Sequence, residues 1–203
     1  MAGGNPFSVV ARFARRQHGV LHSRSTQYKE NTMHIILYIA TSADGYIADE
    51  HGSVDWLPQA PENPADDLGY EALLKRTSLI LMGDTSYRQI LGFGPWAWPD
   101  HTTYVFSNTP AQEAPANVFF VAGDVHAVIT ALDKRHPHAS AWLLGGANLA
   151  AQYAAADLID EIIVTVTSHT LGKGIALTIP YDNYQLVETK QFSGGLIQKK
   201  FKR

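Results

Sequence analysis

The feature that most constrains this chain is a series of short, mostly apolar runs, each followed by a turn of small residues and then a helical pattern. The run His34–Thr41 (HIILYIAT) is rich in β-forming residues, and Ser78–Met82 (SLILM) and Glu161–Thr167 (EIIVTVT) repeat the theme. A strand that is apolar at successive positions is typically buried on both faces. Because such strands alternate here with helices, the pattern predicts a parallel sheet with right-handed crossovers.

The remaining elements complete this arrangement. We predict strands over His34–Thr41, Ser78–Met82, Thr103–Ser107, Val118–Val121, Ser140–Leu144, Glu161–Thr167, Tyr184–Gln191 and Leu196–Lys202. We predict helices over Asp66–Arg76, Thr85–Leu91 and Asp124–Lys134, and a fourth that follows Gly145-Gly146 and ends at about Ala156. The last two strands pair naturally around Ser193-Gly194-Gly195. The predicted fold class is therefore α/β: a mostly parallel mixed sheet of about eight strands, about four flanking helices and a C-terminal antiparallel hairpin.

Composition excludes several classes of protein. Hydrophobic residues make up 45% of the 203 residues and charged residues 17%, which is ordinary globular composition. A net charge of −3 does not suit a nucleic-acid binder, and no apolar run approaches the roughly 20 residues that span a bilayer. There is no cysteine, and the nine histidines show no metal-ligand spacing. We expect a cytoplasmic protein without a catalytic metal and without nucleic-acid or membrane partners.

The first 32 residues differ from the rest of the chain. They contain Arg12, Arg15, Arg16, Arg24 and Lys29, and their one acidic residue is Glu30. No apolar periodicity is visible in this stretch, so we predict an N-terminal extension over 1–32, without a packed core, and a single domain over 33–203. An Arg-rich, acid-poor start is also typical of a transit peptide, and that alternative stays open.

Three turns of small residues follow predicted strands. They contain Gly83 to Ser86, Ser107-Asn108, and Gly145 to Asn148. Ligands of open α/β sheets bind at the carboxyl ends of the strands, where glycine lets backbone approach a phosphate and a helix N-terminus offers free N–H groups. The first and third turns predict two phosphate cradles in one sheet. Glycines at strand–helix turns also serve packing alone, which is the alternative.

Several of these segments together resemble a known family. They are Thr41–Ala48 (TSADGYIA), Gly52–Leu57 (GSVDWL), Met82–Tyr87 (MGDTSY), Leu143–Gly146 (LLGG), Leu158–Ile162 (LIDEI) and Leu171–Gly174 (LGKG). In this order they resemble the C-terminal reductase domain of bifunctional riboflavin-biosynthesis proteins (RibD) and its dihydrofolate reductase-like relatives. The resemblance runs from Met33 to the C-terminus.

The resemblance implies an NAD(P)H-dependent oxidoreductase of the dihydrofolate reductase or 5-amino-6-(5-phosphoribosylamino)uracil reductase type. Such an enzyme transfers a hydride to a small heterocycle, either a pteridine such as dihydrofolate or a ribosylaminopyrimidine of riboflavin biosynthesis. It also implies a homodimer. The alternative is a non-catalytic nucleotide-binding paralogue that kept the fold.

The resemblance also implies where the dinucleotide binds, with its nicotinamide toward Ala40 and Ile47. The full set of expected cofactor-binding residues is Ala40, Ile47, Gly83, Asp84, Thr85, Ser86, Ser107, Asn108, Gly145, Gly146, Ala147 and Asn148.

Asp84 departs from the family pattern. It replaces the arginine that in the family grips the 2′-phosphate of NADPH. A carboxylate repels that phosphate, yet it can accept hydrogen bonds from a free ribose 2′-hydroxyl. We therefore expect poor discrimination between NADPH and NADH, or a preference for NADH, unless Lys75, Arg76 or Arg88 reaches the ribose. The alternative is that Asp84 merely caps the following helix.

Candidate catalytic residues come from the same resemblance. Dihydrofolate reductases carry a helix carboxylate sixteen residues before the Met-Gly glycine, which corresponds to Asp67. In an apolar cleft its pKa would be raised, which suits proton transfer, and Thr165 would hydrogen-bond to it. Trp56 and Tyr70 are candidates for the wall of the substrate pocket. The alternatives are that Asp67 favours a helix N-terminus, that Thr165 reflects strand propensity and that Tyr70 belongs to the core.

Overall fold

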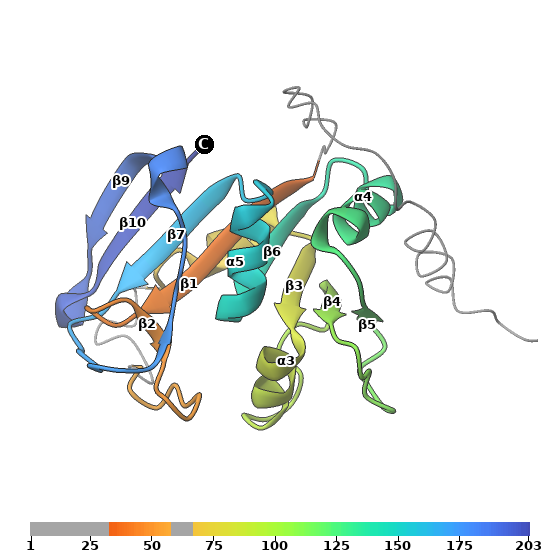
Figure 1. Ribbon diagram of the computed structural model, residues 1–203, viewed down its shortest axis with the longest axis horizontal. Coiled ribbons are helices and arrows are strands. Elements are labelled where there is room, and N and C mark those ends of the chain that lie inside the picture. The colour runs from red at the N-terminus through yellow and green to blue at the C-terminus, as the bar shows by residue number, and fades with distance from the viewer. Residues whose placement is uncertain (1–32, 58–66) are drawn as a thin grey trace, which may run out of the picture.

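The computed structural model describes residues 33–57 and 67–203 (Figure 1). The predicted extension over 1–32 lies outside the described residues, and so does Asp66. No helix within the described ranges has the length and apolar character needed to cross a membrane.

An eight-stranded sheet forms the centre of the molecule. Its strands are β1 (His34–Thr41), β3 (Leu79–Gly83), β4 (Thr102–Phe106), β5 (Val118–Val121), β6 (Ser140–Gly145), β7 (Glu161–Val166), β9 (Gln185–Gln191) and β10 (Ile197–Lys202). They lie in the order β5-β4-β3-β6-β1-β7-β10-β9. The first six are mutually parallel, whereas β10 runs antiparallel to both β7 and β9. The predicted mostly parallel sheet with a closing hairpin is confirmed.

Four helices cover the two faces of this sheet. They are α2 (Tyr70–Arg76), α3 (Asp84–Leu91), α4 (Val125–Arg135) and α5 (Ala147–Ala155). Leu149 and Tyr153 of α5 share one buried cluster with Val128 and Ile129 of α4, and Figure 1 shows α5 lying across the face of the sheet. Leu73 of α2 and Tyr87 of α3 belong to the cluster on the opposite face. The core is therefore two apolar layers separated by the strands.

Strand β1 shows why its sequence is almost continuously apolar. Ile35 and Leu37 belong to one buried cluster, and Ile36 belongs to the other. Side chains alternate between the faces of a strand, so a strand covered by helices on both sides needs an apolar residue at every position. The same alternation places Tyr38 and Ala40 on the face of Ile36.

The C-terminal hairpin is more exposed than the rest of the sheet. All residues of β9 are exposed, including Leu186 and Val187, and β9 is the edge strand of the sheet. A 3₁₀ turn at Ser193–Gly195 joins β9 to β10, with Gly194 at φ 68° in the left-handed region that favours glycine.

A second, two-stranded sheet was not predicted. It pairs β2 (Tyr46–Ala48) with β8 (Ile175–Ala176) in antiparallel orientation. Asp44, in the turn before β2, accepts hydrogen bonds from the Ser42 hydroxyl at 2.6 Å and from the backbone N–H groups of Leu171 and Gly172. The pairing depends on two segments far apart in sequence, so periodicity could not reveal it.

The first predicted helix is wrong at its start. We expected it over Asp66–Arg76, but α2 begins at Tyr70. Leu68 and Gly69 have φ values of 54° and 78°, and this left-handed backbone cannot continue a right-handed helix. Asp67 therefore precedes the helix instead of forming its first turn.

Candidate functional site

A cleft of about 780 Å³ opens at the carboxyl ends of β1, β3, β4 and β6. Its lining divides into an apolar part and a polar part. The apolar part contains Tyr38, Ile39, Ala40, Ile47, Val54, Leu57, Phe93, Trp142, Leu144 and Ile175. The polar part contains Asp84, Thr85, Ser86, Gln89, Ser107, Asn108, Thr109, Asn148 and Gln152. This is where open α/β sheets bind ligands.

The two glycine turns lie side by side in this cleft. A Cβ atom built on Gly83 would lie 4.0 Å from the carbonyl oxygen of Gly145 and from the N atom of Gly146. The proximity follows from the pairing of β3 with β6. Gly83 and Gly146 are the N-caps of α3 and α5, and neither helix has a side-chain cap. Two helix N-termini therefore face one cavity with free backbone N–H groups.

The cleft brings together eleven of the twelve expected cofactor-binding residues. They are Ala40, Ile47, Gly83, Asp84, Thr85, Ser86, Ser107, Asn108, Gly146, Ala147 and Asn148. Gly145 is buried and does not line the cavity, and its peptide bond to Gly146 is cis. That these residues hold a dinucleotide stays a prediction, but their proximity is a property of the fold.

Asp84 is engaged in an ion pair at the cleft. Its Oδ2 accepts a hydrogen bond from Nε of Arg88 at 2.7 Å, one turn further along α3. Its Oδ1 is buried and has no hydrogen-bond partner among the residues that the structure describes. The side chain does not cap α3, which excludes the alternative given above for this residue.

Arg88 also reaches the loop that follows β4. One of its terminal nitrogens donates to the carbonyl of Thr109 at 3.1 Å. The other two cations considered above are held elsewhere, because Lys75 pairs with Glu71 and Arg76 pairs with the buried Glu161. Of these three cations, Arg88 is therefore the one that the fold brings to the polar part of the cleft.

Asp67 does not lie in an apolar environment. Its side chain is exposed, and the carboxylate accepts hydrogen bonds from the backbone N–H groups of Glu71 at 3.0 Å and Gly69 at 2.9 Å. These bonds lower the pKa of Asp67, with the bond from Glu71 as the larger cause. The raised pKa that an apolar cleft would give is therefore absent, and Asp67 is ionised near neutral pH.

Thr165 is connected to the residue beside Asp67 instead of to its carboxylate. The Nε2 atom of Gln198 donates to the Thr165 hydroxyl at 3.0 Å and to the Leu68 carbonyl at 2.8 Å. The Tyr38 hydroxyl donates to the same Leu68 carbonyl at 3.2 Å. Gln198 thus ties β7 and β10 to the segment before α2, a link that sequence reasoning missed.

Tyr38 and Trp142 are cleft residues that sequence reasoning also missed. Their rings meet edge to face with centroids 6.1 Å apart, and the Trp142 indole donates to the backbone carbonyl of Tyr38 at 3.1 Å. Burial raises the pKa of Tyr38 to about 12, aided by the nearby Asp67 charge. The sequence could have indicated Tyr38 as a cleft residue, because it stands two residues before Ala40 and therefore lies on the same face of the strand.

The expected substrate residues Trp56 and Tyr70 do not line the cleft. Tyr70 lies behind its wall: the ring packs against Trp142 at 5.8 Å, and the hydroxyl accepts a 2.7 Å hydrogen bond from the Trp98 indole. Trp56 is half-buried, and in the sequence it lies between Val54 and Leu57, which both line the cleft. Within residues 33–57 and 67–203, no cluster of three or more His, Asp or Glu side chains is arranged to hold a metal ion.

Comparison with solved structures defines the class to which this fold belongs. Dihydrofolate reductase from Enterococcus faecalis, solved in complex with NADP(H) and RAB-propyl, superposes with a TM-score of 0.61 at 16% identity, covering 85% of this chain and 97% of that one. A protein from Shewanella sp. PV-4 named for riboflavin biosynthesis superposes with a TM-score of 0.73 at 30% identity, covering 84% of this chain and 99% of that one. The chain therefore has the dihydrofolate reductase-like fold.

The sequence places the chain within this class. Residues 33–197 match the RibD C-terminal domain, and the chain belongs to that family. It is 35% identical to the uncharacterized protein YwjB of Bacillus subtilis (strain 168) over 172 residues, which are 83% of this chain and 97% of YwjB. YyaP of the same organism, also uncharacterized, is 29% identical over 179 residues. The family resemblance read from the motifs is confirmed.

Proposed function

We propose that this protein is a nicotinamide dinucleotide-dependent reductase that transfers a hydride to a small planar heterocycle. The observation that carries the proposal is the proximity of two glycines, Gly83 and Gly146, each at a helix N-terminus without a side-chain cap, inside one cleft. Such a site suits the pyrophosphate of a dinucleotide, because backbone N–H groups and helix dipoles converge on it.

The cleft has room and chemistry for both parts of the reaction. A bound reduced nicotinamide supplies the hydride. The apolar lining around Ala40 and Ile47 excludes water from a flat ring, and the edges and faces of Tyr38 and Trp142 offer aromatic contact to a heterocycle. The polar rim at Ser107, Asn108 and Asn148 suits ribose and phosphate groups.

Two residues of this chain bear on the delivery of the proton that accompanies the hydride. Tyr38 keeps its proton at neutral pH and lines the cleft, whereas Asp67 is ionised and exposed. An ionised Asp67 acts best as an acceptor that orients a donor, so we propose it as a positioning residue beside Tyr38 and a water molecule as the final acid.

The test is titration of the full-length protein with NADPH and NADH, followed by a turnover assay. The substrate panel contains dihydrofolate, simpler pteridines, and ribosylaminopyrimidines with and without a phosphate. We expect saturable binding of at least one cofactor and oxidation of it by at least one substrate. Failure to bind either cofactor would refute the proposal.

The second candidate is a nucleotide-binding paralogue without catalysis. It is favoured by the lowered pKa and the exposure of Asp67, because the carboxylate expected to assist protonation is ionised and faces solvent. Cofactor binding without oxidation across the whole panel would support this candidate. Oxidation of either cofactor by any member of the panel would exclude it.

A further inference from the structure

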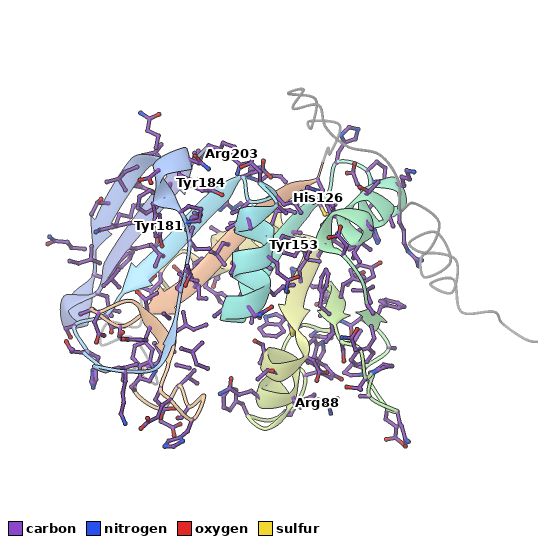
Figure 2. The ribbon with its side chains drawn as sticks, viewed as in Figure 1. Arg88, His126, Tyr153, Tyr181, Tyr184 and Arg203 are labelled. Atoms are coloured by element: carbon purple, nitrogen blue, oxygen red, sulfur yellow. The ribbon has the colours of Figure 1, made fainter. Side chains whose placement is uncertain are left out.

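The ion pair between Asp84 and Arg88 stands at the polar end of the cleft, and Figure 2 shows Arg88 beside α3 at the lower end of the molecule. Arg88 hydrogen-bonds to two residues that line the cavity: Asp84 at the first position of α3 and Thr109 on the loop after β4. Its guanidinium therefore links the start of α3 to the loop after β4. Its side chain is 52% exposed, so it is free to meet a ligand.

We infer that the Asp84–Arg88 pair determines cofactor choice and lets the site accept a nucleotide with or without a 2′-phosphate. This inference rests on the proposed dinucleotide site. Arg88 recognises the phosphate, and Asp84 recognises the free hydroxyl of the unphosphorylated ribose. The two groups neutralise each other when neither ligand group is present.

The geometry gives each partner unused bonding capacity. Arg88 uses Nε for Asp84 and one terminal nitrogen for Thr109, so a guanidinium with five N–H donors still has donors left for a phosphate. Asp84 has one oxygen bonded to Arg88, while its other oxygen accepts no hydrogen bond from residues 33–57 or 67–203. A buried carboxylate oxygen without a donor is costly, and a small rotation would let a ribose hydroxyl satisfy it.

Electrostatics decides how the pair responds to each cofactor. A lone carboxylate at this point would repel a phosphate, but a carboxylate paired with a guanidinium presents little net charge. A dianionic phosphate attracts Arg88 more strongly than the single charge of Asp84 does, and guanidinium–phosphate bonds are charge-assisted and bidentate. The pair therefore replaces the preference for NADH expected from Asp84 alone with an ability to use both cofactors.

The experiment measures dissociation constants of the full chain for four probes: NADPH, NADH, adenosine 2′,5′-bisphosphate and adenosine 5′-monophosphate. The variants are Arg88→Gln, Arg88→Lys and Asp84→Asn. The matched control is Lys75→Gln, which breaks an exposed i,i+4 pair with Glu71 on α2 and changes the net charge equally. Thermal unfolding of each variant checks that it is folded.

For the wild type we expect NADPH and NADH to bind within about tenfold of each other. Arg88→Gln should weaken NADPH and the bisphosphate by about 10- to 100-fold, because a charge-assisted contact is lost and Asp84 is left to repel the phosphate. NADH and the monophosphate should change by less than about threefold. Arg88→Lys should keep most of the phosphate preference.

Asp84→Asn should act in the opposite direction and tighten NADPH by roughly five- to tenfold relative to NADH. Lys75→Gln should leave all four dissociation constants unchanged.

A proportional loss of affinity for NADPH and NADH in Arg88→Gln, or no change in either affinity, would overturn the inference while leaving the proposed function intact. Arg88-dependent binding of the bisphosphate without hydride transfer would support the inference and refute the proposed reductase. Binding of none of the four probes would overturn both.

Discussion

Among the described glycines, Gly174 leaves the least space for a side chain. A Cβ atom built there would lie 2.2 Å from the carbonyl oxygen of Ala48, because β2 and β8 approach closely at this point. We predict that Gly174→Ala lowers the free energy of unfolding by about 1–3 kcal/mol, since backbone must move to relieve the contact. Urea denaturation measures the change. Gly172→Ala is the matched control: its Cβ would meet nothing within 4 Å, and we expect a smaller loss.

Asp44 makes the stability of the region around β2 and β8 sensitive to acid. The Ser42 hydroxyl, and then the N–H groups of Gly172 and Leu171, lower the pKa of Asp44 to about 2. A folded pKa below the unfolded value of about 3.9 means that this residue stabilises the fold above that value and loses its contribution as pH falls toward about 2. We predict that Asp44→Asn flattens the fall of the melting temperature between about pH 4 and pH 2. Ser42→Ala should do so in part, and an unchanged slope in both variants would contradict the prediction.

At the scale of single residues, the sequence indicated which chemical groups the site contains but not which residues those groups contact. It predicted the lone carboxylate at position 84 but not its partner Arg88, which reaches it only because a helix starts at Asp84 and places both on one face. It predicted Asp67 as a helical residue in a cleft, whereas the left-handed backbone at Leu68 and Gly69 holds Asp67 outside the helix.

Helix α5 and the turn before it give a prediction at the scale of elements. Gly146 lines the cleft, and a Cβ there would lie 3.4 Å from the Ser86 hydroxyl, at the edge of ordinary contact. We therefore predict that Gly146→Ala is tolerated, whereas Gly146→Val obstructs the space between the two helix N-termini and lowers cofactor affinity by at least about tenfold. Calorimetric titration measures affinity, and circular dichroism checks the fold. Full affinity in Gly146→Val would remove this turn from the site.

Elements were predictable where they bury two faces or alternate regularly. The parallel strands and the hairpin fall within a residue or two of their expected bounds, because the strands of the core are continuously apolar and the hairpin strands flank a Gly-Gly turn. Strand β8 was missed, because two residues that are exposed and paired only with β2 leave no periodic trace.

For the whole molecule we predict that residues 1–32 are dispensable. The first buried strand starts at His34, and the preceding sequence has no periodic apolar face. Protein comprising residues 33–203 should therefore show the melting temperature and cofactor affinity of the full chain. A drop in melting temperature of more than a few degrees would show that the extension contributes to stability.

We also predict that the chain forms a homodimer. Strand β9 is an edge strand, and its exposed Leu186 and Val187 leave apolar surface at the rim of the sheet. Sedimentation equilibrium at micromolar concentration should give about twice the 22.3 kDa of one chain. A mass near 22 kDa would contradict the prediction.

By itself, the sequence determined the architecture: strand burial, the strand–helix alternation and the closing hairpin are written in local periodicity and turn residues, which act over a few residues at a time. It also determined which turns carry glycine. Only the tertiary structure decided that Gly83 and Gly146 lie side by side, that Arg88 of α3 reaches the Thr109 carbonyl on the loop after β4, and that Gln198 joins Thr165 to the Leu68 carbonyl. These contacts arise where strand order brings distant segments together, and strand order depends on the packing of the whole sheet.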